Sequence, residues 1–198
     1  RDAAALSAAG PPRILALGAV SHARRTLALV AAFEHLVAGQ PDGDRPVLRL
    51  VGRPGDAADA LRAHLADSPA ADRVTWTADP VEADLPELVA GSTLLVHLST
   101  GELSPITPLE ALHFGVAVVA SDLPAFDPEL DGEERVSRGI EDTPALLAAA
   151  LRRGLARGLD DEARAVRRGL ASFHTWDACA ADHLGVWREA IEDPDYDR

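Results

Sequence analysis

Short runs of apolar residues alternate along the chain with longer segments in which apolar residues recur every three or four positions. The runs are continuous rather than alternating between apolar and polar residues, which is typical of strands buried on both faces. The longer segments have helical spacing, as in the apolar face formed by Leu27, Val30 and Phe33. The pattern predicts strands at 13–18, 46–52, 72–78, 92–99 and 116–121, and a sixth at 134–139. It predicts helices within 23–39, 56–67, 82–91 and 108–114, and helices almost throughout 143–192.

This alternation predicts an α/β fold, namely a doubly wound (Rossmann-like) parallel sheet of about six strands with helices on both faces. We find no domain boundary within 12–192, and a hydrophobic content of 47% is enough for one sizeable core. Residues 1–11 are expected to be a linker or tail, and 193–198 an acidic tail. Because the chain begins with Arg1 and contains no methionine, we expect it to be a piece of a longer protein.

Charge and composition exclude several classes of function. The net charge of −13 argues against nucleic-acid binding, which normally requires a basic face. No apolar run approaches the roughly 18 residues of a membrane span, so we expect no membrane segment in this chain. Cys179 is the single cysteine and can form no internal disulfide, which favours a reducing, cytoplasmic location.

The familiar cofactor motifs are absent from the sequence. No Gly-x-Gly-x-x-Gly follows the first predicted strand and no P-loop occurs, which disfavours a dinucleotide oxidoreductase and a P-loop NTPase. No Gly-x-Ser-x-Gly and no metal-spaced cluster of histidines and cysteines is found, so we expect neither a metal nor a cofactor. His22 and His97 stand next to loops that follow predicted strands. Each is either a ligand contact or an ordinary structural histidine.

The most informative stretch is STGELSPITPLEALHFGVAVVASD, which holds two carboxylates, Glu102 and Glu110, eight residues apart. The segment 107–110 reads as a capping box, with Thr107 as N-cap, Pro108 as the first helical residue and Glu110 bonding back to the Thr107 amide. The same helix start would also suit an anion, because its amides are free. The local pattern therefore leaves open whether Glu110 is a cap or a ligand.

Five segments in order resemble the C-terminal, donor-binding domain of a GT-B glycosyltransferase of the group 1 retaining type, which carries an E-x7-E motif. The resemblance covers roughly 13–190. The segments are ILALGAVSHARRTLALVAAFEHL, LRLVG, RVTWTADPVEADLPELVAGSTLLVHLS, GELSPITPLEALHFGVAVVASDLPA and FHTWDACAADHLGVWREA. The resemblance implies that the chain is one half of a GT-B fold, that its substrate is a nucleoside-diphosphate sugar, and that an N-terminal acceptor-binding domain accompanies it.

The resemblance also implies roles for individual residues. Glu102 would contact hydroxyls of the donor sugar, Glu110 the ribose hydroxyls, and Arg24 or Arg25 the diphosphate. Ionised carboxylates accept hydroxyl hydrogen bonds, and a guanidinium can pair with a phosphate through two hydrogen bonds. The remaining positions implied in donor binding belong to the glycine loop and to the turn before the helix: Gly18, Ser104, Ile106, Thr107 and Leu109.

The sequence departs from the family pattern at two places. Ala19 stands where the family has an arginine, and Leu103-Ser104-Pro105 replaces a loop with two glycines. Two functions are therefore open. One is the donor-binding half of a sugar transferase, inactive without the acceptor-binding domain. The alternative is a degenerate glycosyltransferase-like domain that acts as a non-catalytic binding module.

Overall fold

The fold, seen in a computed structural model that describes residues 10–41, 43, 45–127 and 130–192, is built on one sheet of six parallel strands. The strand order is β3-β2-β1-β4-β5-β6. The strands are β1 (Arg13–Leu17), β2 (Val47–Val51), β3 (Val74–Thr77), β4 (Leu94–His97), β5 (Ala117–Ser121) and β6 (Glu134–Val136). This order is that of a doubly wound sheet, and it confirms the α/β, Rossmann-like prediction, the sixth strand included.

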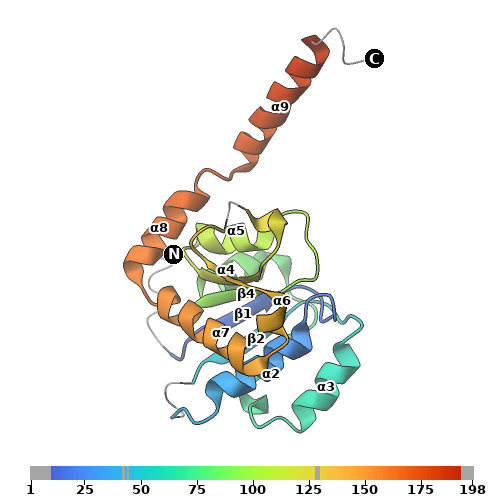
Figure 1. The fold of residues 1–198 in the computed structure, drawn as a ribbon, viewed down its shortest axis with the longest axis vertical. Coiled ribbons are helices and arrows are strands. Elements are labelled where there is room, and N and C mark those ends of the chain that lie inside the picture. Colours follow the sequence, from blue (N-terminus) through green and yellow to red (C-terminus); the bar gives the residue numbers. More distant parts are fainter. Residues whose placement is uncertain (1–9, 42, 44, 128–129, 193–198) are drawn as a thin grey trace.

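The helices follow the strands in the alternation that the sequence predicts (Figure 1). The α-helices are α2 (Thr26–Val37), α3 (Ala58–Ala66), α4 (Leu85–Ala90), α5 (Ile106–His113), α6 (Arg138–Glu141), α7 (Pro144–Gly158), α8 (Asp161–Ala171) and α9 (Trp176–Glu192). Short 3-10 turns stand at Ala71–Arg73, Glu82–Asp84 and Pro124–Phe126. The expected terminal segments 1–11 and 193–198 lie outside the described residues, apart from Gly10 and Pro11.

Helices cover both faces of the sheet because neighbouring strand residues face opposite ways. Ile14 belongs to the core cluster that also contains residues of α2, α3 and α7, whereas Leu15 belongs to the cluster with residues of α4, α5 and α8. The central strands β4 and β5 are therefore buried along their whole length, as their continuous apolar runs indicate, whereas the edge strands β3 and β6 are partly exposed.

Helix α5 begins two residues earlier than the sequence predicts. Pro105 is its N-cap, no side chain caps it, and Thr107 lies inside its first turn. The predicted capping box is therefore wrong. The physical reason is Pro105, whose carbonyl oxygen accepts the first helical hydrogen bond, from the Leu109 amide at 2.8 Å, so that the helix starts before Thr107 can cap it. Pro108 is tolerated because the first-turn amides have no helical partner.

Helix α9 stands apart from the rest of the domain. None of its residues is buried, and it extends away from the sheet (Figure 1). Its large apolar side chains are exposed, together with one in the preceding turn: Phe173, Trp176, Leu184, Val186, Trp187 and Ile191. Among the described residues, no helix combines the length and the apolar character that a membrane crossing requires.

Close packing of α7 on the sheet gives a test of the fold. A Cβ atom on Gly158 would lie 2.1 Å from the carbonyl oxygen of Thr93, whereas one on Gly169 in α8 would meet nothing within 4 Å. We expect Gly158→Ala to lower the free energy of unfolding by about 1–3 kcal/mol, because backbone must shift. Gly169→Ala is expected to raise it by up to ~1 kcal/mol through helix propensity. Urea unfolding measures both, and equal effects would contradict the packing.

Candidate functional site

Two loops meet where the strand order reverses, between β1 and β4. Residues 18–25 follow β1 and 98–105 follow β4, so both loops leave the carboxyl edge of the sheet, where doubly wound folds bind ligands. The Thr100 amide donates to the Ala23 carbonyl oxygen at 3.0 Å, which joins the loops directly.

Glycines allow the backbone to pass closely beneath these loops. Gly18 has a φ of +130°, and its amide donates to the Val51 carbonyl oxygen at 2.9 Å. A Cβ atom on Gly52 would lie 2.1 Å from the Gly18 carbonyl oxygen. The glycine at the end of β1 therefore has a structural reason beyond any ligand, because residues with side chains rarely adopt its φ, and Gly52 leaves the space through which the Gly18 carbonyl passes.

Arg24, Glu102 and His97 form one polar cluster at this edge. The Arg24 guanidinium donates to the Glu102 carboxylate, and its Nη1 atom lies 2.9 Å from His97 Nε2. His97 Nε2 is also 3.1 Å from Glu102 Oε1. The side chains of Arg24 and Glu102 are 32% and 18% exposed, and that of His97 is 5% exposed. The structure thus brings together two predicted site residues and one of the two histidines that the sequence left open.

The electrostatics of the cluster keep His97 neutral. Burial lowers the pKa of His97 below its ordinary value of 6.5, and the Arg24 charge lowers this pKa further, against the opposing effect of Glu102. The imidazole also packs edge-on against the Phe126 ring at a centroid distance of 5.7 Å. A neutral imidazole can accept a hydrogen bond from Arg24 through Nε2, so its lone pair helps to orient the guanidinium.

The neighbouring arginine points to a different part of the molecule. Arg25 is the N-cap of α2 and has a φ of 51°, which is unusual for a residue other than glycine. Its side chain, 9% exposed, forms an ion pair with Glu141 of α6 at 2.7 Å and another with Asp142. The sequence could not choose between the two arginines, and the structure places only Arg24 against Glu102.

The remaining predicted residues lie along α5 and the loop before it. Glu110 is exposed in the second turn of α5, and Ser104 is exposed in the loop. Ile106 is 49% exposed, while Thr107 and Leu109 are half-buried. Leu109 packs against the core cluster of its sheet face. Glu110 is therefore available to a ligand and does not cap the helix.

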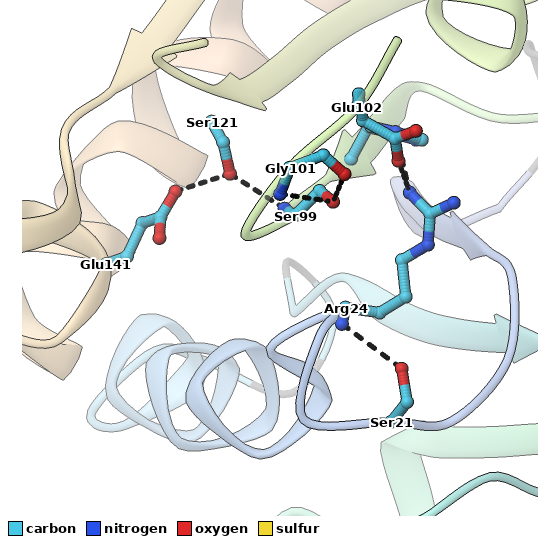
Figure 2. Close-up of polar contacts among 8 residues, drawn as sticks. Ser21, Arg24, Ser99, Gly101, Glu102, Ser121 and Glu141 are labelled. Atoms are coloured by element: carbon cyan, nitrogen blue, oxygen red, sulfur yellow. Dashed lines mark hydrogen bonds and ion pairs between the residues drawn. The ribbon is translucent and has the colours of Figure 1, made fainter.

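A buried network behind the cluster was missed by sequence reasoning. The Ser99 amide donates to Ser121 Oγ at 2.8 Å, and that hydroxyl donates to the Glu141 carboxylate (Figure 2). The polar residue Ser121 at the end of an otherwise apolar strand was the available signal. Glu141 carried no such signal in the sequence, because an acidic residue in a polar segment is ordinary.

The hollow beside the cluster is small. It lies between the ends of β1 and β4, is lined in part by Leu17, Gly18, Arg24 and His97, and has a volume of about 20 Å³. This is the room that one water molecule needs. Within the described part of the chain, no three or more His, Cys, Asp or Glu residues are grouped to hold a metal ion.

Comparison with known proteins identifies the family. The family described as glycosyl transferases group 1 matches residues 11–157, about three quarters of the chain. The chain belongs to the group 1 glycosyltransferases. A comparison with curated protein sequences gave no match.

Solved glycosyltransferase structures have the same fold. One is a sucrose-phosphate synthase from Thermosynechococcus elongatus (TM-score 0.76, 20% identity), of which 45% aligns with 91% of this chain. Another is the pneumococcal O-GlcNAc transferase GtfA in complex with UDP and GlcNAc (TM-score 0.75, 16% identity, 38% of its chain and 94% of this one). A third is an α,α-trehalose-phosphate synthase from Burkholderia vietnamiensis (TM-score 0.71, 16% identity, 43% and 92%). This glycosyltransferase chain thus spans less than half the length of these structures, and its fold is that of one GT-B domain.

The buried histidine of this glycosyltransferase predicts a pH dependence of stability. Because the pKa of folded His97 lies below 6.5, the unfolded chain takes up the proton first, and stability is lost as the pH falls below about 6.5. We expect His97→Gln to reduce the fall in the free energy of unfolding between about pH 7.5 and 5.5. Urea titrations at both pH values measure this. The exposed His113→Gln is the control, and equal slopes for wild type and His97→Gln would refute the prediction.

Proposed function

We propose that this chain is the donor-binding domain of a retaining glycosyltransferase, which transfers a sugar from a nucleoside-diphosphate sugar to an acceptor. The observation that carries the proposal is the meeting of Arg24 and Glu102 at the point where the strand order reverses. An arginine suits the diphosphate and a carboxylate suits sugar hydroxyls. A cytoplasmic location, expected from the single cysteine, is part of the proposal.

A change of ion-pair partner at Arg24 explains how the site would accept a donor. Without a ligand, Arg24 and Glu102 neutralise each other across the two loops. A diphosphate carries more negative charge than one carboxylate and competes for the guanidinium. Glu102 is then released to accept hydrogen bonds from hydroxyls of the donor sugar. Binding would therefore convert one internal ion pair into two contacts with the ligand.

Helix α5 would supply the rest of the donor site. The amides of Ile106 and Thr107 lie in the first turn of α5 and have no hydrogen-bond acceptor within the helix. The helix dipole also favours an anion at that end. Glu110, exposed one turn further on, would accept the ribose hydroxyls, with Gly18, Ser104 and Leu109 around the donor. We assign the diphosphate contact to Arg24 because Arg25 is engaged by Glu141 and Asp142.

Catalysis would then consist mainly of stabilising the leaving group. As the bond between the sugar and the diphosphate breaks, negative charge grows on the diphosphate. Arg24 and the start of α5 would face that charge, and fixed donors of this kind lower the barrier because they need no reorganisation. We propose no protein nucleophile.

A second domain would complete the cleft. The hollow at Arg24 is too small for a nucleotide sugar, and the solved relatives are more than twice as long as the segment that this chain matches. The side chains of Trp176, Trp187 and Ile191 on helix α9 are exposed. We propose that an N-terminal acceptor-binding domain packs against α9 and closes over the donor.

A non-catalytic binding module is the second candidate. Ala19 removes one cation that the family pattern has near the diphosphate, and Pro105 removes an amide donor from the loop. Leu103 is 99% exposed in that loop, which would suit contact with a protein as well as closure over a sugar. Nucleotide binding separates the two candidates.

Calorimetry with UDP, GDP and ADP tests donor binding. We expect one of them to bind the chain at millimolar or lower concentration, and Arg24→Ala and Glu110→Ala each to weaken that binding by about tenfold, the value of one lost charged contact. Glu110→Ala should change the free energy of unfolding by no more than ~0.5 kcal/mol because its side chain is exposed, whereas Arg24→Ala should lower it by up to ~2 kcal/mol because Glu102, 18% exposed, loses its cation.

Glu87→Ala, which removes an exposed carboxylate from α4, is the matched control and should bind like the wild type. If no nucleotide binds the wild type at millimolar concentration, the binding-module candidate is favoured. If Glu110→Ala lowers stability and leaves affinity intact, Glu110 has no part in the site.

Sugar transfer gives a second test of the proposal. The 198-residue chain by itself should release no sugar to an acceptor from UDP-, GDP- or ADP-glucose, because the half of the cleft that would hold the acceptor is not among the described residues. Radiolabelled donor measures this. Robust transfer by the chain alone would show that no further domain is required.

A further inference from the structure

We infer that Glu141 is a positioning residue that ties together the two loops carrying Arg24 and Glu102, and thereby fixes the spacing of the donor site. Glu141 is the last residue of α6, and its side chain is 4% exposed. It touches neither Arg24 nor Glu102 in any contact described above. The inference that Glu141 affects nucleotide binding rests on the proposed function. The inference that it connects the two loops rests on the buried network alone.

One oxygen of the carboxylate holds the loop after β4. Glu141 Oε1 accepts a hydrogen bond from the Ser121 hydroxyl, which in turn accepts one from the Ser99 amide at 2.8 Å. Both hydrogen bonds are buried. Ser99 begins the loop that leads to Glu102, and its own hydroxyl donates to the Gly101 carbonyl oxygen at 2.9 Å. The position of Glu102 is thus set, through three residues, by a carboxylate on another element (Figure 2).

The other oxygen holds the loop after β1. Glu141 Oε2 lies 2.7 Å from Nε of Arg25, an ion pair whose angles are not those of a hydrogen bond. Arg25 keeps a left-handed backbone conformation, which is costly for a side-chain-bearing residue and persists only where the surroundings enforce it. With Arg25 held towards α6, the preceding residue Arg24 projects towards Glu102, and its amide donates to Ser21 Oγ at 3.2 Å.

Burial makes this coupling strong. A carboxylate removed from water needs both of its partners, because loss of Arg25 would remove its countercharge and loss of the Ser121 hydroxyl would leave an oxygen without a hydrogen bond. A shift of one loop would therefore break a bond of Glu141 and also disturb the other loop. The hydrogen bond from the Thr100 amide to the Ala23 carbonyl oxygen is a second connection between the same two loops. The geometry points to a site in which the loop that carries Arg24 and the loop that carries Glu102 are displaced only together.

The chain offers a matched control at the opposite edge of the sheet. The Glu133 carboxylate, 7% exposed, accepts from the Val118 amide at 2.7 Å and pairs with Arg167 Nε at 2.8 Å. Like Glu141, it is a buried carboxylate that holds one neutral donor and one arginine, although its neutral donor is a backbone amide and Arg157 Nη2 lies 3.5 Å from it as a further cation. Val118 and Gly115, which Arg167 also contacts, lie near the start of β5, away from the carboxyl ends of the strands.

The experiment compares Glu141→Gln, Ser121→Ala and Glu133→Gln in two measurements on the same chain. Calorimetry gives the affinity for UDP, GDP and ADP, and amide hydrogen exchange gives the protection of 18–25 and 98–105. We expect Glu141→Gln to weaken nucleotide binding by about tenfold, since small displacements of binding groups are costly. It should accelerate exchange in both loops. Ser121→Ala should act mainly on 98–105. Glu133→Gln should lower stability without changing affinity or loop exchange.

The outcomes separate this inference from the proposed function. If Glu141→Gln binds within twofold of the wild type, or loses no more affinity than Glu133→Gln, the positioning role is refuted. If the wild type binds no nucleotide, the proposed function fails, and exchange alone decides: acceleration in both loops supports the coupling, and acceleration in one or neither overturns it. If Glu141→Gln does not fold, Ser121→Ala decides, and it overturns the inference if 98–105 keeps its wild-type exchange.

Discussion

Parallel pairing requires a crossover that returns the chain to the same side before each new strand, so all the strands end at one edge of the molecule and the crossover helices bury both faces of the sheet. Every polar contact of the candidate site depends on this constraint. Segments far apart in sequence, 18–25 and 98–105, become neighbours because β1 and β4 pair at the centre of the sheet. The loop that starts after Ser121 and helix α6 reach the same edge through β5 and β6. The sheet therefore gathers charged residues that the chain itself disperses.

Gathering charges at a partly buried edge creates an electrostatic problem, and paired side chains solve it. The chain has a net charge of −13, yet the site that we propose for an anion depends on arginine. Arg24 is balanced by Glu102 and Arg25 by Glu141, so neither cation is left uncompensated when the site is empty. The two pairs differ in exposure. The Arg24 pair is accessible and can be exchanged for a ligand, whereas the Arg25 pair is buried and remains structural.

The predictable part of the fold was the part governed by continuous apolar runs. All six strands lie inside their predicted ranges, and in β4 and β5, where every residue is buried, burial dominates local preference. The start of α5 was not predictable from a capping pattern, since Pro105 begins the helix earlier than Thr107 could. Glu102 and Arg24 were expected at the site, but the choice between Arg24 and Arg25 depends on a left-handed residue that no local pattern announces. The link from Ser99 through Ser121 to Glu141 is purely tertiary.

Helix α9 has a consequence for how the unfolding of this protein would be observed. Two of the three tryptophans, Trp176 and Trp187, lie on this helix, which contributes no buried residue to the domain. Trp76 alone borders the core, where its indole donates to the Gly52 carbonyl oxygen at 2.9 Å. Intrinsic fluorescence would thus report mostly on a segment outside the cooperative unit. Replacing both α9 tryptophans by phenylalanine would leave Trp76 as a clean optical probe of the edge at which β2 and β3 end.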